Sequence, residues 1–410
     1  MHGLRMSLKD LTIDCLLCIF DYCSEADLLC LCKADAALEY IIDTHYFHPL
    51  AYDLLLSGHR NSPRIEQRNR KRLKNYERLE VSRNWVSGTY FERPYFHHAQ
   101  MFPTKLCLES DYLYITHAGY LRKYRRTSHD ALERRYEEEI TTSTQTDISD
   151  FVKKQSTIFA GRVCGSCFHC DVDEPSLTEQ RMHPANEYLY CVDFVNDLYA
   201  TSTDNCCRLW QRSEEFGMIH FDMVTNLPHA FRSMKLSSDG QWLYGGLYSD
   251  KATRRALKGV HVESGEEIVF NSSTMSIYDL KLKDDQVIFT ANFDTTFRMF
   301  DRRIDRDVAI WEDPFDSSFY SLEYDGLYGV LVGTNRHSRV NLYDIRMKKY
   351  VQLYFPSRTR EHKGFSPVYS LACDSQYMFV ATDHNLRVFD FKSNRGIRRD
   401  YSNINVLMNK

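Results

Sequence analysis

The feature that most constrains this chain is an internal repeat that occupies its C-terminal three quarters. Four copies are clear, and each closes on a large aromatic side chain, at Trp210, Phe300, Tyr343 and Phe389. Three weaker copies close at Tyr124, His169 and His261. Successive closing residues are 39 to 51 positions apart. A period of roughly 40 to 45 residues is typical of one four-stranded blade of a β-propeller, so seven copies predict seven blades.

A polar residue lies six positions before the closing aromatic in each clear copy, at Asp204, Asp294, His337 and Asp383. Residues six apart lie on one face of a strand, because side chains alternate with a period of two. The Asp can hold the tight turn while the aromatic packs between blades. We therefore expect a mainly β fold, a seven-bladed WD-type β-propeller. We also expect a solvated outermost strand that carries Arg208, Arg298 and Arg387.

The first 88 residues have a different pattern. Apolar residues recur at spacings of three to five between residues 8 and 56, which indicates short helices. A basic stretch follows, with the run RNRKRLK from Arg68, and it is typical of a solvated linker helix. The chain thus divides into a helical bundle at 1–56, a basic helical linker at 57–88 and a propeller at 89–410. Residues 127–147 have no period, and we expect an inserted loop there.

Composition excludes several classes of protein. Lys and Arg number 52 against 56 Asp and Glu, a formal net charge of −4, which does not suit a dedicated binder of nucleic acid or anionic membranes. No apolar run approaches the ~20 residues of a membrane span. The first apolar stretch is interrupted by charges, and the 13 Cys are irregularly spaced. We expect a soluble protein of a reducing compartment, cytoplasmic and/or nuclear.

One cysteine cluster has spacing that could suit zinc. The segment CGSCFHC holds Cys164, Cys167, His169 and Cys170. Strand alternation would send Cys164 and Cys167 to opposite faces, and no second Cys pair follows at finger spacing. We therefore expect buried thiols with no metal and no cofactor, and likewise helix-core thiols at Cys15 and Cys18. The sequence carries no nucleophile elbow, P-loop, zinc-protease or dinucleotide motif, which indicates a protein that is not an enzyme.

Two N-terminal segments resemble a known family. The segment LKDLTIDCLLCIFDYCSEADLLCLCK resembles an F-box, and VSRNWVSG, with Asn84, Trp85 and Gly88, resembles the Asn-Trp-x-x-Gly entry into the propeller of F-box/WD-repeat proteins. The order of F-box, basic linker, Asn-Trp element and propeller is the plan of that family. Thr12 stands where the family usually has Pro, and Phe47 or Leu50 where it usually has Trp.

The resemblance implies a function. Such a protein is the substrate-recognition subunit of a Skp-cullin-F-box ubiquitin ligase, in which the F-box docks on the Skp adaptor of the cullin ligase core and the propeller recruits a target protein for ubiquitination. The chain itself is then a non-catalytic adaptor subunit. The main alternative is a WD-repeat interaction scaffold with a degenerate F-box and no ligase. An RNA-associated propeller that uses the basic linker is a third, less favoured reading.

An adaptor-binding face should be apolar, because helix docking depends on a few buried anchors. The candidates are the apolar residues of the first two helices: Leu11, Ile13, Leu16, Ile19, Phe20 and Leu28. About half of them are expected to form the core of the bundle instead, because so small a bundle needs its own core.

The substrate-binding face follows from equivalent positions of the repeat. The first strand of four blades carries a Tyr at the same place, and Arg232 holds that place in a fifth. Relatives use this position and the one before the turn Asp to line the top surface. The candidates are Arg162, Tyr190, Arg232, Tyr278, Phe293, Tyr320, Arg336 and Tyr369. Tyr and Arg suit flat protein recognition. The alternative is that the Tyr rings pack between blades with only their hydroxyls exposed.

Overall fold

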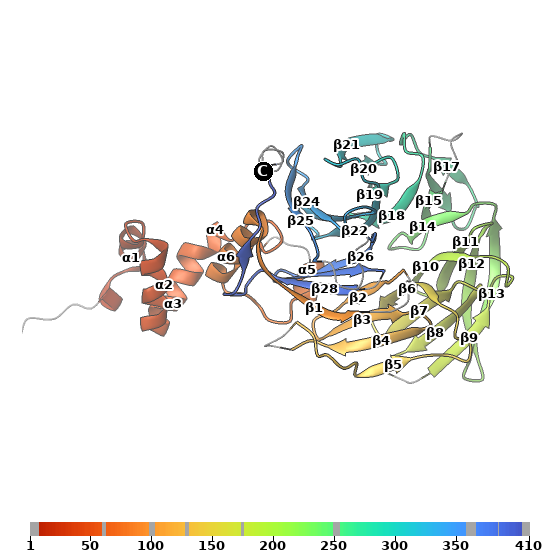
Figure 1. Cartoon of the computed structure of the whole chain (residues 1–410), viewed down its shortest axis with the longest axis horizontal. Helices are drawn as coiled ribbons and strands as arrows, with labels where there is room; N and C mark the ends of the chain where they lie inside the picture. Colours follow the sequence, from red (N-terminus) through yellow and green to blue (C-terminus); the bar gives the residue numbers. More distant parts are fainter. Residues whose placement is uncertain are drawn as a thin grey trace, which may run out of the picture.

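The computed structural model describes residues 8–59, 63–97, 103–127, 131–173, 176–248, 255–357, 366–383 and 385–403. Its helices gather at one side, and its strands form a propeller at the other (Figure 1). The helical elements are η1 (Leu8–Asp10), α1 (Ile13–Phe20), α2 (Glu25–Ala34), α3 (Ala36–Ile41), η2 (Ile42–Phe47), α4 (His48–Leu50), α5 (Pro63–Arg68) and α6 (Asn75–Ser87). No described helix is long and apolar enough to cross a membrane.

Polar caps start the first helices. The Thr12 hydroxyl accepts a hydrogen bond from the Cys15 amide at the start of α1, so Thr in place of the usual Pro still begins the helix. Ser24 and Asp27 form a capping box at the start of α2. The helices bury one apolar core, which consists of Leu16, Phe20, Leu28, Cys32, Leu38, Ile42 and Phe47. Phe47 thus fills part of the core.

The described strands form seven antiparallel sheets, which confirms the predicted seven-bladed propeller. The first three blades are β2 (Leu106–Leu108), β3 (Tyr112–His117), β4 (Tyr120–Arg125) and β5 (Glu138–Ile140); β6 (Ile148–Lys154), β7 (Thr157–Arg162), β8 (Ser166–Asp171) and β9 (Ser176–Arg181); and β10 (Leu189–Val195), β11 (Leu198–Thr203), β12 (Cys207–Glu215) and β13 (Met218–Leu227). The next three are β14 (Phe231–Leu236), β15 (Trp242–Leu247), β16 (Leu257–His261) and β17 (Glu267–Val269); β18 (Ile277–Leu282), β19 (Val287–Asn292), β20 (Thr296–Asp301) and β21 (Arg306–Glu312); and β22 (Phe319–Tyr324), β23 (Gly329–Thr334), β24 (Val340–Asp344) and β25 (Tyr350–Tyr354).

The seventh blade joins the two ends of the propeller. It consists of β26 (Val368–Cys373), β27 (Tyr377–Thr382), β28 (Asn385–Asp390) and β1 (Thr89–His97), with β29 (Ile397–Arg398) at the edge. β1 pairs antiparallel with β28, from Phe91 opposite Asp390 to His97 opposite Asn385. The strand that follows the linker therefore closes the ring. The first strands of neighbouring sheets contact one another, so they are the innermost strands.

The repeat pattern places its anchors as predicted. All seven closing residues lie on the third strand of their blade, and all except His261 are buried. The third strand also carries Arg208, Arg298 and Arg387, so the prediction of a solvated outermost strand for these residues is wrong. The fourth strand covers them. Arg298, for example, is buried and pairs with Asp294 at 2.7 Å and with Asp307 of β21 at 2.8 Å.

Two further predictions need correction. β5 lies inside residues 127–147 and pairs with β4, so part of the expected loop is the fourth strand of the first blade. Cys15 and Cys18 are exposed, because Leu16 and Phe20 occupy the core-facing side of α1. Cys167 and Cys170 are buried on β8, as expected, and they belong to two different core clusters. Cys164 lies in the turn before β8 and is only half-buried, so its expected burial on a strand is wrong.

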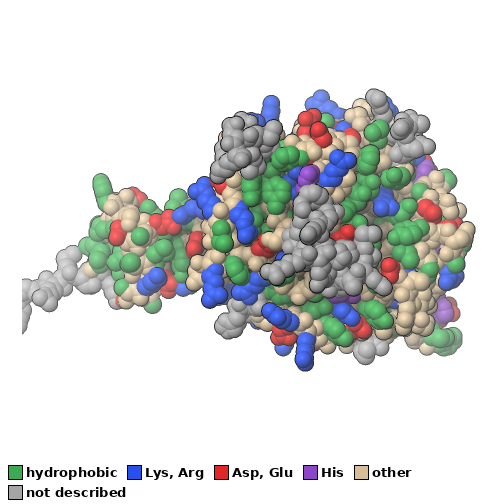
Figure 2. All heavy atoms as spheres, in the orientation of Figure 1, with side chains coloured by type: hydrophobic (Ala, Val, Ile, Leu, Met, Phe, Trp, Pro, Cys, Tyr) green, Lys and Arg blue, Asp and Glu red, His purple; other side chains and the backbone are tan. Residues whose placement is uncertain are grey.

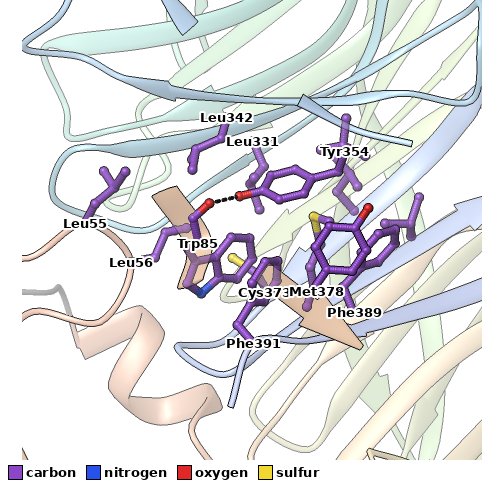
Figure 3. Packing of buried hydrophobic residues seen from close by; sticks show 14 of the residues in the cluster. Leu55, Leu56, Trp85, Leu331, Leu342, Tyr354, Cys373, Met378, Phe389 and Phe391 are labelled. Carbon is purple, nitrogen blue, oxygen red and sulfur yellow. Dashed lines mark hydrogen bonds between the residues drawn. The ribbon is translucent and has the colours of Figure 1, made fainter. Parts of the chain in front are cut away.

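The Asn-Trp-x-x-Gly element fixes the linker to the seventh blade. Trp85 is buried and stacks on Phe391 with ring centroids 3.5 Å apart, and its Nε1 donates to the Ser375 carbonyl at 2.9 Å. The Tyr354 hydroxyl donates to the Trp85 carbonyl at 2.6 Å (Figure 3). Asn84 donates to the Phe391 carbonyl at 2.7 Å. Gly88 ends α6 at φ 67°, where an added Cβ would lie 2.3 Å from the Arg399 oxygen.

The rest of the linker lies on the mouth formed by the ends of the innermost strands. Arg68 donates to Glu323 near the end of β22 at 2.6 Å and to the carbonyl of Cys373, the last residue of β26. Asn69 bonds with Ser375 in the turn that follows β26. The Leu56 amide donates to Asp325, which follows β22. The linker thus occupies one mouth of the propeller.

Candidate protein-interaction surfaces

The other mouth is formed by the starts of the innermost strands, and a β-bulge lies there in six blades. The strand register shifts in β6, β10, β14, β18, β22 and β26, each time around the second residue of the strand. A bulge leaves one residue outside the ladder and re-aims its side chain. In five successive blades the residue at this position is one of the predicted substrate-face residues: Tyr190, Arg232, Tyr278, Tyr320 and Tyr369.

These five side chains, which we call the aromatic arc, contact one another in series. The Arg232 guanidinium lies 4.3 Å from the ring centre of Tyr190 and 5.7 Å from that of Tyr278. Tyr278 stacks on Tyr320 with centroids 4.3 Å apart, and Tyr320 meets Tyr369 at 6.1 Å. The repeat therefore predicted which residues come together, and the bulges explain why the same position of the strand is used in these five blades.

Three exposed rings extend the arc. Phe293, which the sequence predicted, lies 6.1 Å from Tyr278 and is 46% exposed. Tyr248 lies 6.2 Å from Tyr278 and is 57% exposed, and Tyr188 lies 5.2 Å from Tyr190. Tyr188 and Tyr248 were not predicted. Tyr188 lies in the loop before β10, and Tyr248 follows β15 as Phe293 follows β19. The segment EYLYC, with a second Tyr two residues before Tyr190, was the available signal.

Three phenols on this surface, those of Tyr188, Tyr278 and Tyr369, have a raised pKa and stay protonated at neutral pH. Burial raises the pKa of Tyr369 to about 12, with Asp383 and Tyr320 acting in the same direction and Arg232 opposing. Burial is also the main cause that raises the pKa of Tyr278 and Tyr188. These three hydroxyls are therefore neutral donors and acceptors at the surface. Such an amphipathic surface suits contact with another protein.

Two other predicted substrate-face residues lie in different settings. Arg336 is exposed, in the turn between β23 and β24. Arg162 is 0% exposed, contrary to the prediction that it lines the surface. It ends β7, and its guanidinium donates to the carbonyls of Gly119 and Thr146 and, at 2.9 Å, to the Thr142 hydroxyl. The long side chain is used to satisfy backbone acceptors between the first two blades.

The predicted adaptor face divides into core and surface. Leu16, Phe20 and Leu28 are buried within the bundle, so they do not belong to a docking surface. Ile13 and Ile19 are exposed, and Leu11 is half-buried against the core. The division of the six candidates into halves follows the expectation that a small bundle needs its own core.

The exposed side of α1 and the turn that follows it carry a stripe of side chains. Cys15, Cys18, Ile19 and Tyr22 lie at spacings of three and four, and all are exposed. Tyr22 is 94% exposed. The stripe faces away from the core, and no described residue covers it. We call these four residues the α1 stripe.

No protein-family model matches the chain. It is 23% identical to F-box/WD repeat-containing protein 4 (dactylin) of Mus musculus over 336 residues, which is 77% of each chain, and 23% identical to the Homo sapiens protein of the same name over 334 residues, again 77% of each chain. These matches support an F-box/WD-repeat assignment.

One cluster inside the propeller has potential metal ligands. His183, Glu187 and Cys206 place their ligand atoms within 4.8 Å of one another. A hydrogen-bond chain accounts for the arrangement: Trp210 Nε1 donates to the Thr201 hydroxyl at 2.8 Å, this hydroxyl lies 2.7 Å from His183 Nε2, and His183 Nδ1 lies 3.2 Å from Glu187. Burial and the charge of Arg208 lower the pKa of His183 to about 4, so the ring is neutral and stabilises the third blade.

Proposed function

We propose that this chain is the non-catalytic substrate-recognition subunit of a Skp-cullin-F-box ubiquitin ligase. The α1 stripe would dock on the Skp adaptor, and the aromatic arc would hold the protein to be ubiquitinated. The names of the two relatives and the propeller support a substrate-recognition role in an F-box protein.

The observation that carries the proposal is the occupation of the two propeller mouths. The linker lies on one mouth through Arg68, Asn69 and Trp85, and the mouth lined by the arc is at the other ends of the same strands. A target bound at the arc is thus held on a body that is fixed to the helical bundle. Such an arrangement raises the local concentration of an acceptor lysine near a conjugating enzyme without chemistry by this chain.

The adaptor contact predicts a specific loss of binding. An Ile19→Asp, Tyr22→Asp double variant of the full chain should lose at least tenfold in affinity for the purified Skp adaptor, because two charges replace exposed apolar anchors. The measurement is a titration by biolayer interferometry. Phe20→Asp is not a suitable variant, because Phe20 is 0% exposed and its charge would disrupt the bundle core.

The matched control for the adaptor experiment is a Phe216→Asp, Met218→Asp variant. These two apolar side chains lie at the exposed tip of the β12–β13 hairpin, and Phe216 is 100% exposed. Adaptor binding should survive in the control. If the unaltered chain fails to bind the adaptor, the ligase role is wrong and a scaffold role replaces it.

The arc predicts a loss of target binding when its central rings are removed. A Tyr278→Ala, Tyr320→Ala variant should reduce the recovery of ubiquitinated partners on the order of tenfold or more, because central aromatic anchors each contribute about 2 kcal/mol or more to binding. The readout is quantitative mass spectrometry of proteins that co-purify with the full chain, with the hairpin-tip variant as control. A Tyr248→Ser, Phe293→Ser variant tests the same surface through exposed residues. Unchanged partner sets in both variants would show that targets bind elsewhere.

A further inference from the structure

A hollow of about 770 Å³ lies where the linker passes the first and last blades, on the side away from the arc. Its walls come from four parts of the chain: the linker between Asn69 and Leu73, Arg93 of β1, the end of β4, and the turns that flank β27 and β28. We call this hollow the linker pocket. Figure 2 shows Lys and Arg side chains gathered where the helical part meets the propeller.

The linker pocket is strongly basic. Two carboxylates, Asp374 and Asp390, line it. The cationic side chains on its walls are Arg70, Lys71, Arg93, Arg126, Lys392 and Arg395. The whole chain carries a net charge of −4, so this excess of positive charge is local and does not follow from composition.

One arginine forms a fixed wall of the pocket. Arg126 is buried, donates through Nη1 to the carbonyls of Arg68, Glu109 and Ser110, and pairs through Nη2 with Asp374. Its Nε–H is buried and has no hydrogen-bond partner among the described residues. Its other hydrogen bonds hold the guanidinium in one orientation at the edge of the pocket.

Other cations of the pocket are held loosely. The carboxylate nearest to Arg70 is that of Asp111, at 4.0 Å. Lys71 and Arg395 are exposed and form no ion pair with any described residue. Lys392, by contrast, pairs with Glu77 at 2.6 Å. The pocket therefore combines a rigid arginine with charges that are available to a ligand.

We propose that the linker pocket binds a compact polyanion that carries several phosphate groups. Arginine and lysine side chains that converge from separate segments match clustered phosphates. The volume is that of a small-molecule site. A nucleic-acid backbone would need a continuous basic stripe, and the linker does not supply one. Arg68 turns inward to Glu323 and Lys74 pairs with Glu39, so the basic run points in several directions.

The test uses the full chain and myo-inositol hexakisphosphate as the probe. Isothermal titration at 0.15 M salt should show saturable binding at one site, and the probe should raise the melting temperature because it binds the folded state. A Lys71→Gln, Arg395→Gln variant should weaken binding at least tenfold. The matched control, Arg134→Gln with Arg135→Gln, removes the same charge from exposed positions outside the pocket and should bind like the unaltered chain.

Three results would overturn the proposal. The first is no binding of the probe, and the second is an equal loss of affinity in the two variants. The third is tighter binding of a 20-nucleotide single-stranded RNA than of the probe, lost in the Lys71→Gln, Arg395→Gln variant, which would assign the pocket to nucleic acid. Inorganic phosphate should bind more weakly than the probe if several phosphates are read together. None of these variants touches the arc or the α1 stripe, so the outcome is independent of the ligase role.

Discussion

Replacing Trp85 with alanine should lower the apparent free energy of unfolding by about 3–5 kcal/mol, the range for removal of a large buried aromatic. The indole stacks on Phe391, contacts Tyr354 edge-on at 5.8 Å and donates a hydrogen bond to the Ser375 carbonyl. Its loss creates a cavity and an unpaired acceptor at the junction of linker and last blade. Urea denaturation followed by circular dichroism measures the effect.

The neighbouring residue supplies the control for Trp85. Val86 is exposed, and Val86→Ala should change stability by less than about 0.5 kcal/mol. Trp85→Phe keeps much of the packing but removes the Nε1 donor. Its loss of unfolding free energy should therefore lie between those of Val86→Ala and Trp85→Ala. A loss below 1 kcal/mol for Trp85→Ala would show that the linker does not depend on this contact.

Replacing His169 with phenylalanine should make stability less sensitive to acid. The ring packs near Tyr199 and Phe221, with centroids 6.0 and 6.1 Å away, and its Nδ1 is buried without a partner among the described residues. Burial, aided by the charge of Arg212, lowers its pKa from 6.5 to about 4. Below pH 6.5 the unfolded chain takes up a proton that the folded chain does not, so the folded state loses stability down to about pH 4.

The size of this acid effect follows from linkage. The unaltered chain should lose about 2 kcal/mol at pH 5 through His169, and the phenylalanine variant should not. Denaturation curves of both proteins at pH 7.5 and pH 5 measure this effect. The unfolding free energy of the variant minus that of the unaltered chain should be about 2 kcal/mol more positive at pH 5 than at pH 7.5. The pKa of His183 is also lowered to about 4, but His183 titrates in both proteins and cancels. Between pH 7.5 and pH 9 the difference should stay constant, and a difference that is constant down to pH 5 as well would contradict the prediction.

The sequence was informative where the signal repeats. Trp210, Phe300, Tyr343 and Phe389 identify third strands because an aromatic at a fixed place in each blade is a local requirement of packing between sheets. The arc was predictable for the same reason, because in five successive blades the same bulged position lies at the mouth. Because the chain contains seven copies of the repeat, equivalent positions can be compared within this one sequence.

The sequence was uninformative where a residue's surroundings come from elsewhere in the chain. Arg162 has the right repeat position, but its burial depends on carbonyls of the first blade that no repeat position encodes. The two faces of α1 were indistinguishable because both are apolar, and only packing against Ile42 and Phe47 separates Leu16 from Ile19. The linker pocket could not be predicted from the sequence for a related reason, since its cations are distant from one another along the chain.

The pairing of β1 with β28 has a consequence for synthesis of the chain. Phe91 meets Asp390, about 300 residues later, so β1 leaves the ribosome long before its partner strand exists. Until the last blade is made, the N-terminal helices are complete while the strand attached to them has an open edge. Under the proposed function, a chain that ends early in the last blade would keep the bundle that binds the adaptor but would lack a closed ring to hold a target. Such truncated chains should act as dominant competitors of the full-length protein.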